Sequence, residues 1–226
     1  MAQKLVFDSS TIISISEKCL TRLLKGLGQE GAVSFVIPQS VYAETVERPL
    51  HIKRFELGAL RIQQAVDEGW IEIIPGNAAV KQLTGKILDS ANTLFFAKGK
   101  PLTIIQKGEA ETLALCKNLR AHMVAIDERT TRMLIEDPWR LQNYVAYKHQ
   151  QDIKLNEGRL KEFIKLLSDI RVVRSVELIA LAYERGYFEE VLPRNRQALE
   201  AALFALKFGG CAVSSQEIEE FLRAKR

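Results

Sequence analysis

The sequence predicts an α/β protein: a mainly parallel β-sheet flanked by helices, followed by an all-helical C-terminal extension. Two patterns along the 226 residues lead to this prediction. Up to about residue 137, short apolar runs typical of buried strands alternate with segments of helical spacing, as expected of a parallel sheet. Beyond that residue, apolar positions recur only at helical spacing. A polar stretch at about 137–155 separates the two patterns, so we predict two domains, residues 1–137 and 138–226.

The predicted strands are short apolar runs, partly β-branched or aromatic, that end at turn-forming residues. They span residues 5–8, 33–37, 70–74 and 123–126. Helical spacing predicts helices between and after them, at 12–27, 38–46, 51–69, 78–97, 108–119, 160–170, 175–186, 196–210 and 215–226. Gly186 and Gly209–Gly210 are typical of helix ends, and Ser214 or Ser215 is typical of an N-cap.

The composition is that of a globular protein of the cytoplasm. No apolar run approaches the ~20 residues that a membrane-spanning helix needs, and the N-terminus lacks the layout of a signal peptide. The three cysteines are scattered, which favours buried thiols in a reducing compartment over disulfides or a zinc site. The three histidines have no metal-ligand spacing. The net charge of +4 permits a polyanionic partner without requiring one.

Acidic residues stand where the predicted strands end and where the following helices begin. Asp8 ends the first strand and Asp127, with Glu128 beside it, ends the fourth; the helical acids are Glu44, Glu109 and Glu111. Each acid alone can be explained by a structural role, because the helix dipole favours acids in a first turn and Asp127 can cap a helix. Together, however, they would meet at one edge of the sheet and repel one another unless a cation neutralises them. Ligand sets made only of carboxylate oxygens favour Mg²⁺ or Mn²⁺ over zinc.

Four of these segments, in this order, resemble the PIN domain, a metal-dependent nuclease fold. They are "LVFDSSTII", "IPQSVYAETV", "KGEAETLALC" and "VAIDERTTR", and the resemblance covers roughly residues 4 to 135. It is closest to the prokaryotic branch with a "GEAE" motif, and "SVELIALAYERGYF" and "CAVSSQEIEEFL" extend it weakly into the C-terminal helices. The chain differs from the commoner pattern in having Glu109 for the third Asp and Ile126 where Thr often precedes the fourth acid.

The resemblance implies catalytic, metal-binding carboxylates at Asp8, Glu44, Glu109 and Asp127. Ser10 matches the small hydroxyl residue that supports the first Asp, and we group it with the predicted substrate contacts. Glu111 is a further candidate ligand, although residues two apart on a helix point about 200° away from each other. Lys107, Arg129 and Arg132 flank the acidic motifs and are predicted to contact substrate, unless they are simply solvated side chains.

The implied function is a metal-dependent ribonuclease that hydrolyses phosphodiester bonds of single-stranded or structured RNA with Mg²⁺ or Mn²⁺. Two alternatives stay open: the toxin of a toxin–antitoxin pair, and a nucleic-acid-binding PIN scaffold with little or no cleavage. The corresponding partners are RNA or single-stranded DNA, a second copy of the chain in a homodimer, and an antitoxin-like protein. No membrane is expected among the partners.

Overall fold

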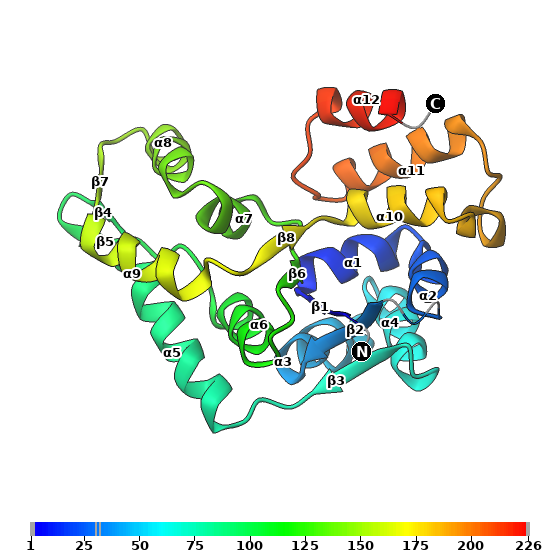
Figure 1. Cartoon of the computed structure of the whole chain (residues 1–226), viewed down its shortest axis with the longest axis horizontal. Coiled ribbons are helices and arrows are strands. Elements are labelled where there is room, and N and C mark those ends of the chain that lie inside the picture. The colour runs from blue at the N-terminus through cyan, green and yellow to red at the C-terminus, as the bar shows by residue number, and fades with distance from the viewer. Residues whose placement is uncertain (1–2, 30, 32, 225–226) are drawn as a thin grey trace.

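A five-stranded parallel sheet lies at the centre of the computed structural model, which describes residues 3–29, 31 and 33–224 (Figure 1). The strand order is β3-β2-β1-β6-β8. The strands are β1 (Gln3–Phe7), β2 (Val33–Pro38), β3 (Ile71–Ile74), β6 (Met123–Ala125) and β8 (Arg171–Val173). Every neighbouring pair in this sheet is parallel. All five strands therefore end at the same edge, where ligand sites of such sheets collect.

Helices cover both faces of the sheet, and successive strand residues enter opposite cores. Leu5 and Phe7 belong to one buried cluster, whereas Val6 between them belongs to the other. The same alternation continues through β6 and the residue after it: Val124 and Ile126 face the second cluster and Ala125 faces the first. This period of two is the geometry of a strand buried on both faces.

The two clusters receive different sets of helices. The first contains side chains from α1 (Ser9–Glu17), α2 (Thr21–Gln29), α3 (Gln39–Tyr42), η1 (Ala43–Glu47), α4 (Glu56–Asp67), α10 (Ser175–Glu184), η3 (Tyr187–Glu190), α11 (Arg196–Phe208) and α12 (Ser215–Ala224). The second contains side chains from α5 (Ala78–Asn92), α6 (Lys107–Asn118), α7 (Arg129–Glu136), α8 (Pro138–His149) and α9 (Glu157–Leu167). The predicted fold class, a parallel sheet flanked by helices with further helices at the C-terminal end, is confirmed.

Residues beyond 138 contribute two strands that the sequence did not indicate. β8 adds to the edge of the central sheet beside β6, and β7 (Ile153–Leu155) pairs with β4 (Phe95–Ala97). Each has only three residues, too few for an apolar period to be recognised. Because C-terminal residues enter both buried clusters, they complete the cores of the N-terminal segment. The division into 1–137 and 138–226 stays a prediction.

The helix predicted for 78–97 ends at Asn92, and a small antiparallel sheet follows it. The Asn92 side chain accepts hydrogen bonds from the backbone N–H groups of Ile104 and Ile105 and donates one to the Ile105 carbonyl. β4 then turns back into β5 (Lys100–Pro101) through Lys98 and Gly99, both at positive φ. Two such residues are typical of a tight hairpin turn. The sequence does not reveal this hairpin, because its apolar residues continue the helical spacing.

Other predicted helices are divided rather than absent. The segment predicted as 12–27 forms α1 and α2, separated at Cys19, whose φ is 61°. The segment 38–46 forms α3 and the π-helical turn η1, and Pro49 starts the short 3₁₀ turn η2 (Pro49–His51) before α4. The last two residues of the helix predicted for 215–226 lie outside the described residues.

The C-terminal helices are attached to the sheet edge through Arg174, which is only 7% exposed. Its guanidinium donates hydrogen bonds to Glu177, to Glu217 and to the Ala212 carbonyl. Ser214 caps α12 as predicted, because its hydroxyl accepts from the Glu217 N–H while Glu217 accepts from the Ser214 N–H. Burial opposes ionisation of Glu217, but hydrogen bonds from Ser214 and Arg174 lower its pKa to about 2.

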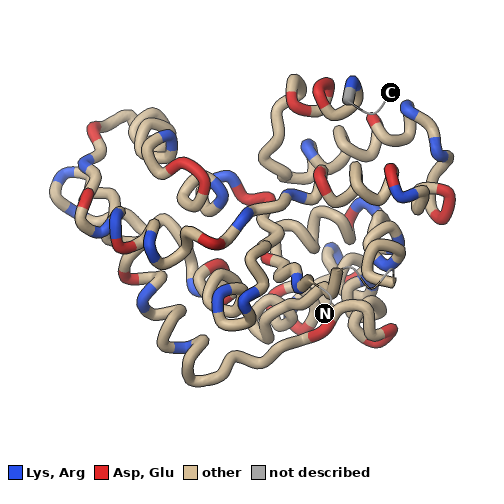
Figure 2. Tube along the Cα trace, in the orientation of Figure 1, with Lys and Arg blue, Asp and Glu red and all other residues tan. Residues whose placement is uncertain are grey.

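Of the helices described, none is both long enough and apolar enough to cross a bilayer. Lys and Arg alternate with Asp and Glu along most of the chain trace (Figure 2). The two signs of charge are mixed on most elements, so individual segments have to be considered for any binding role.

Candidate functional site

Four carboxylates stand at the carboxyl edge of the sheet and interact pairwise. Asp8 follows β1, Glu44 lies in η1 after β2, Glu109 lies in the first turn of α6, and Glu128 follows β6. We call these four residues the acid cluster. The charge of Glu44 acts on Asp8, and the charges of Asp8 and Glu128 act on Glu109, so the four side chains form one electrostatic group.

Asp8 is the most buried member of the acid cluster, at 2% exposed. Its Oδ2 accepts hydrogen bonds from the Ser10 N–H (3.1 Å) and the Ser10 hydroxyl (2.7 Å), which caps the start of α1. Its Oδ1 is buried and has no hydrogen-bond partner. Burial raises the pKa of Asp8, and the negative charge of Glu44 raises it further. A buried carboxylate oxygen without a hydrogen-bond partner destabilises the folded state. A bound cation would remove this destabilisation.

Glu44 reaches the acid cluster from an exposed position on η1. Its Oε2 accepts a hydrogen bond from the Ser9 hydroxyl at 3.2 Å. On the other side it lies against Gly108, where a Cβ would stand 3.5 Å from Glu44 Oε2. The Glu44 carboxylate therefore lies at van der Waals distance from the first turn of α6.

Glu109 is half-buried and is held by two donors. Its Oε2 accepts from the Gln106 N–H, which completes a capping box at the start of α6, and its Oε1 accepts from the Thr131 hydroxyl at 2.9 Å. Burial raises the pKa of Glu109, and the charges of Asp8 and Glu128 contribute in the same direction. These hydrogen bonds fix the carboxylate beside Asp8 despite the repulsion.

Glu128 was not among the predicted site residues, yet it is the acid after β6 whose charge acts on Glu109. Its Oε2 accepts from the Thr131 N–H at 2.6 Å and so caps α7. Thr131 thus contacts both glutamates, with its N–H on Glu128 and its hydroxyl on Glu109. The sequence signal was the acidic pair after the fourth strand, but the pattern could not say which of the two residues faces the other acids.

Asp127, the predicted fourth ligand, has its carboxylate directed to α10 instead. It is 1% exposed; its Oδ1 accepts from the Ser175 N–H (2.7 Å) and its Oδ2 from the Ser175 hydroxyl (2.6 Å). Burial raises the pKa of the neighbouring Cys211 thiol to about 12, and the charge of Asp127 adds to the shift. Strand alternation explains the direction, because Ala125 faces the C-terminal helices, Ile126 faces away, and Asp127 faces them again.

The other acid of α6, Glu111, lies apart from the acid cluster. Its Oε1 is close to Gly76, where a Cβ would stand 3.3 Å away, and it lines a hollow between α5 and α6 with Lys107 and Lys81. Residues 109 and 111 therefore face different surfaces, as their spacing on a helix predicts. Lys107 is exposed at the start of α6.

The remaining predicted substrate contacts have partners within the fold. Ser10 donates to Asp8 and accepts from the Asp127 N–H at 3.1 Å, so it links β1 to β6. The Arg129 guanidinium lies 5.5 Å from the centre of the Tyr144 ring. Arg132 donates to Glu136 and to the Ala212 carbonyl. Among these residues, Arg129 is exposed and directly follows Glu128 in the chain.

One comparison with known proteins returned a match. A family model described as a PIN domain matches residues 4–137, more than half of the chain. The chain belongs to the PIN domain family. The matched residues include the whole acid cluster. PIN domains are usually nucleases, so membership of the family suggests a nucleic acid substrate. Neither the search of curated proteins nor the search of solved structures returned a match.

PIN domains generally use divalent metals, and the donor set of the acid cluster suits such an ion. Within the described part of the chain, however, no three His, Cys, Asp or Glu side chains converge in a geometry that could hold a metal. Each glutamate of the cluster is turned toward a hydroxyl or backbone donor of its own. The unpaired Asp8 Oδ1 and the carboxylate oxygens of the cluster are donors of the kind that a divalent cation accepts.

In the absence of metal, Asp8→Asn is expected to raise the melting temperature at neutral pH. The raised pKa of Asp8 means that the folded state favours the protonated form. Its contribution to stability is present below the ordinary Asp value of 3.8 and is lost as the pH rises through the folded pKa. Asn removes the buried charge and still accepts the Ser10 N–H as an N-cap.

Thermal melts in EDTA between pH 4 and 8 check this expectation. The advantage of the variant should shrink as the pH falls toward 3.8. Mn²⁺ at a hundred times its Kd should stabilise the wild-type chain by about 2.7 kcal/mol and leave Asp8→Asn unchanged. A variant that is less stable than wild type at every pH would contradict the assignment.

Proposed function

We propose that this PIN domain is a metal-dependent ribonuclease that hydrolyses phosphodiester bonds in single-stranded or structured RNA. The observation that carries the proposal is the Asp8 carboxylate, buried at the carboxyl edge of the sheet with one oxygen unpaired and with Glu44 and Glu109 near enough to interact with its charge. Such a concentration of carboxylates stabilises neither the core nor the surface, because the side chains repel one another. A bound Mg²⁺ or Mn²⁺ would neutralise this repulsion, so we infer that the acid cluster is a cation site.

The acid cluster would hold the cation, with Asp8 as its buried member and Glu44, Glu109 and Glu128 closing around it. A bound Mg²⁺ or Mn²⁺ lowers the pKa of a water and stabilises negative charge on phosphate oxygens. The chain's own residues orient the ligands: Ser10 holds Asp8, Ser9 holds Glu44, and Thr131 holds Glu109 and Glu128. Hydroxyl donors of this kind fix carboxylate orientation and tune affinity.

We place Asp127 outside this ligand set, as the residue whose hydrogen bonds connect the end of β6 to the start of α10. Glu111 is likewise placed outside it, as a neighbour of Lys107 on another surface. Lys107 and Arg129, exposed at the starts of α6 and α7, are proposed to contact the phosphate backbone next to the cluster. Basic residues there offset the repulsion between the carboxylates and the substrate.

A cleavage assay tests the proposed function. Labelled single-stranded RNA and DNA of the same sequence are incubated with the chain in Mn²⁺, Mg²⁺ or EDTA. We expect RNA cleavage with either cation and none in EDTA. The absence of cleavage under all conditions would leave the non-cleaving scaffold as the better description. The toxin alternative, an antitoxin-like partner and the homodimer stay predictions from the sequence.

A further inference from the structure

A short basic segment directly follows the turn that carries Glu44. Residues 48–55, "RPLHIKRF", contain three basic residues, one histidine and no acid. They form η2 and the turn that leads into α4. All five residues from His51 to Phe55 are exposed, including Ile52 (47%) and Phe55 (41%). We call residues 48–55 the basic arm.

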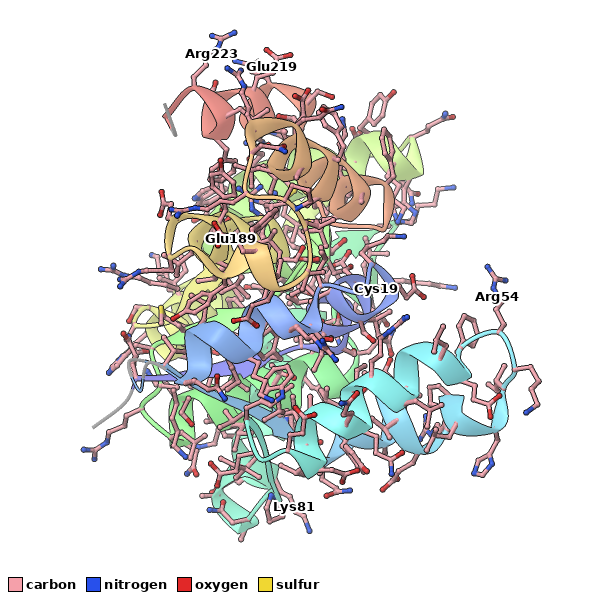
Figure 3. All side chains as sticks on the ribbon, turned by 90° about the vertical axis from the view of Figure 1, so that its right-hand side faces the viewer. Cys19, Arg54, Lys81, Glu189, Glu219 and Arg223 are labelled. Carbon is pink, nitrogen blue, oxygen red and sulfur yellow. The ribbon has the colours of Figure 1, made fainter. Side chains whose placement is uncertain are left out.

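The basic arm projects from the body of the protein beside α4, with Arg54 pointing outward (Figure 3). Backbone hydrogen bonds order it: the Ile52 N–H donates to the Pro49 carbonyl, and the Phe55 N–H donates to the Ile52 carbonyl. The Arg54 guanidinium lies 5.4 Å from the centre of the Phe55 ring. An ordered arm therefore presents an aromatic face and a cation together.

A pocket of about 290 Å³ opens between the basic arm, α1 and α4. Its walls are mainly apolar and include Ile13, Ile52, Phe55 and Ile62. Arg48, Glu17 and Glu44 also line it, so the pocket reaches one member of the acid cluster, Glu44. The volume lies at the low end for ligand pockets, ~300 to 1,000 Å³, and suits one planar ring system.

The charges of the arm point to a polyanion as its ligand. Lys53 pairs with Glu56, whereas no ion pair is formed by Arg48 or Arg54 in the part of the chain that the structure describes. Aromatic rings next to unpaired cations are the usual means of binding single-stranded nucleic acid, because every base can stack and every phosphate attracts a cation. In a duplex the bases are stacked on one another and cannot enter such a pocket.

We propose that the basic arm and its pocket form a subsite for a single-stranded nucleic acid: an unpaired base enters beside Phe55, and Arg48 and Arg54 contact its phosphates. The inference rests on the proposed function, since it places the strand within reach of Glu44 and the acid cluster. It adds a binding place for one unstacked base of the strand, next to the scissile phosphate.

A protein partner is the competing occupant, since Leu57 (60%) and Leu60 (48%) expose further apolar surface on α4. The absence of acids between residues 48 and 55 and the small pocket beside the acid cluster favour nucleic acid. Binding measurements with matched nucleic acid probes distinguish the two occupants.

Fluorescence anisotropy in EDTA measures binding of the full chain to three labelled RNA probes: a single strand, its duplex, and an abasic strand of equal length. We expect the single strand to bind best. Phe55→Ala should weaken its binding by roughly 5- to 150-fold, the range for loss of one stacked base. The abasic strand should bind wild type and variant equally, and Phe55→Tyr should retain wild-type affinity.

Two matched controls accompany these variants. Phe208→Ala removes an aromatic ring that is 80% exposed on α11 and should change nothing. Arg54→Ala should lower the slope of log affinity against log salt concentration by about 0.7 for each phosphate that Arg54 neutralises. Lys81→Ala, at an exposed position on α5, should leave this slope unchanged. Melting temperatures of all variants are measured in parallel.

Unchanged affinity of a folded Phe55→Ala chain, or no binding of wild type to any probe, would overturn the inference. So would a self-associated wild type, by light scattering, that Phe55→Ala separates without any change in RNA affinity. The proposed subsite and the proposed nuclease activity can be refuted independently of each other. Phe55-dependent binding without cleavage leaves the subsite standing alone, and cleavage with an unaltered KM in Phe55→Ala leaves only the nuclease.

Discussion

Glu109→Gln is expected to abolish Mn²⁺-dependent cleavage, whereas Glu111→Gln retains most of it. The reason is geometric. Burial and the nearby charges of Asp8 and Glu128 raise the pKa of Glu109, while Glu111 lies against Gly76 on another face of α6. Gln keeps the size of the side chain and removes the negative charge that a cation requires. The loss should exceed the ~10–100-fold typical of residues that only orient a ligand.

Single-turnover cleavage rates at several Mn²⁺ concentrations check this expectation. Glu109→Gln should also lose the Mn²⁺-dependent rise in melting temperature, a readout that does not depend on substrate. Glu111→Gln serves as the matched control, since it removes the same charge two residues away on the same helix. An inactive Glu111→Gln with an active Glu109→Gln would reverse the assignment, and two fully active variants would refute the carboxylate site.

Asp127→Asn is expected to destabilise the fold by about 2–3 kcal/mol, while Glu128→Gln leaves stability nearly unchanged. Both oxygens of the buried Asp127 carboxylate accept hydrogen bonds from Ser175, and Asn can satisfy only one of these donors. Hydrogen bonds to a charged group contribute ~1.5–3 kcal/mol each. For a chain of this length the melting temperature should fall by roughly 5–10 °C.

The same pair of variants should respond to Mn²⁺ in the opposite way. Asp127→Asn, measured below its melting temperature, should keep the Mn²⁺-dependent stabilisation and cleavage, whereas Glu128→Gln should lose both. Ser175→Ala provides a control for the structural role, because it removes one of the two donors without altering any carboxylate. If Asp127→Asn were fully stable and lost its Mn²⁺ response, Asp127 would be a ligand and the proposed division of roles would fail.

Local patterns in the sequence were enough to predict the order of the main elements. The four predicted strands are four or five residues long with three or four apolar residues each, and all four occur in the central sheet. Since strands of a parallel sheet end at one edge, the residues after them were expected to meet there. Asp8 was predicted as a site residue in this way, because its place after the first strand depends on its neighbours in the chain alone.

Long-range pairing decided what these patterns could not. β7 and β8 have three residues each and exist as strands only because β4 and β6 pair with them. The helix predicted for 78–97 gives way to β4 because the Asn92 side chain bonds to the backbone at Ile104 and Ile105. Neither interaction is visible in a window of neighbouring residues.

The choice between adjacent acids was also made by the tertiary structure. Asp127 and Glu128 are consecutive, so both stand at the sheet edge in any sequence-based prediction. Ser175, 48 residues later, supplies two donors on one side of that edge and fixes Asp127 there. Glu128 is left beside Thr131 and Glu109. Chemistry along the chain determined that carboxylates gather at this edge, and the partners brought by packing determined which of them face one another.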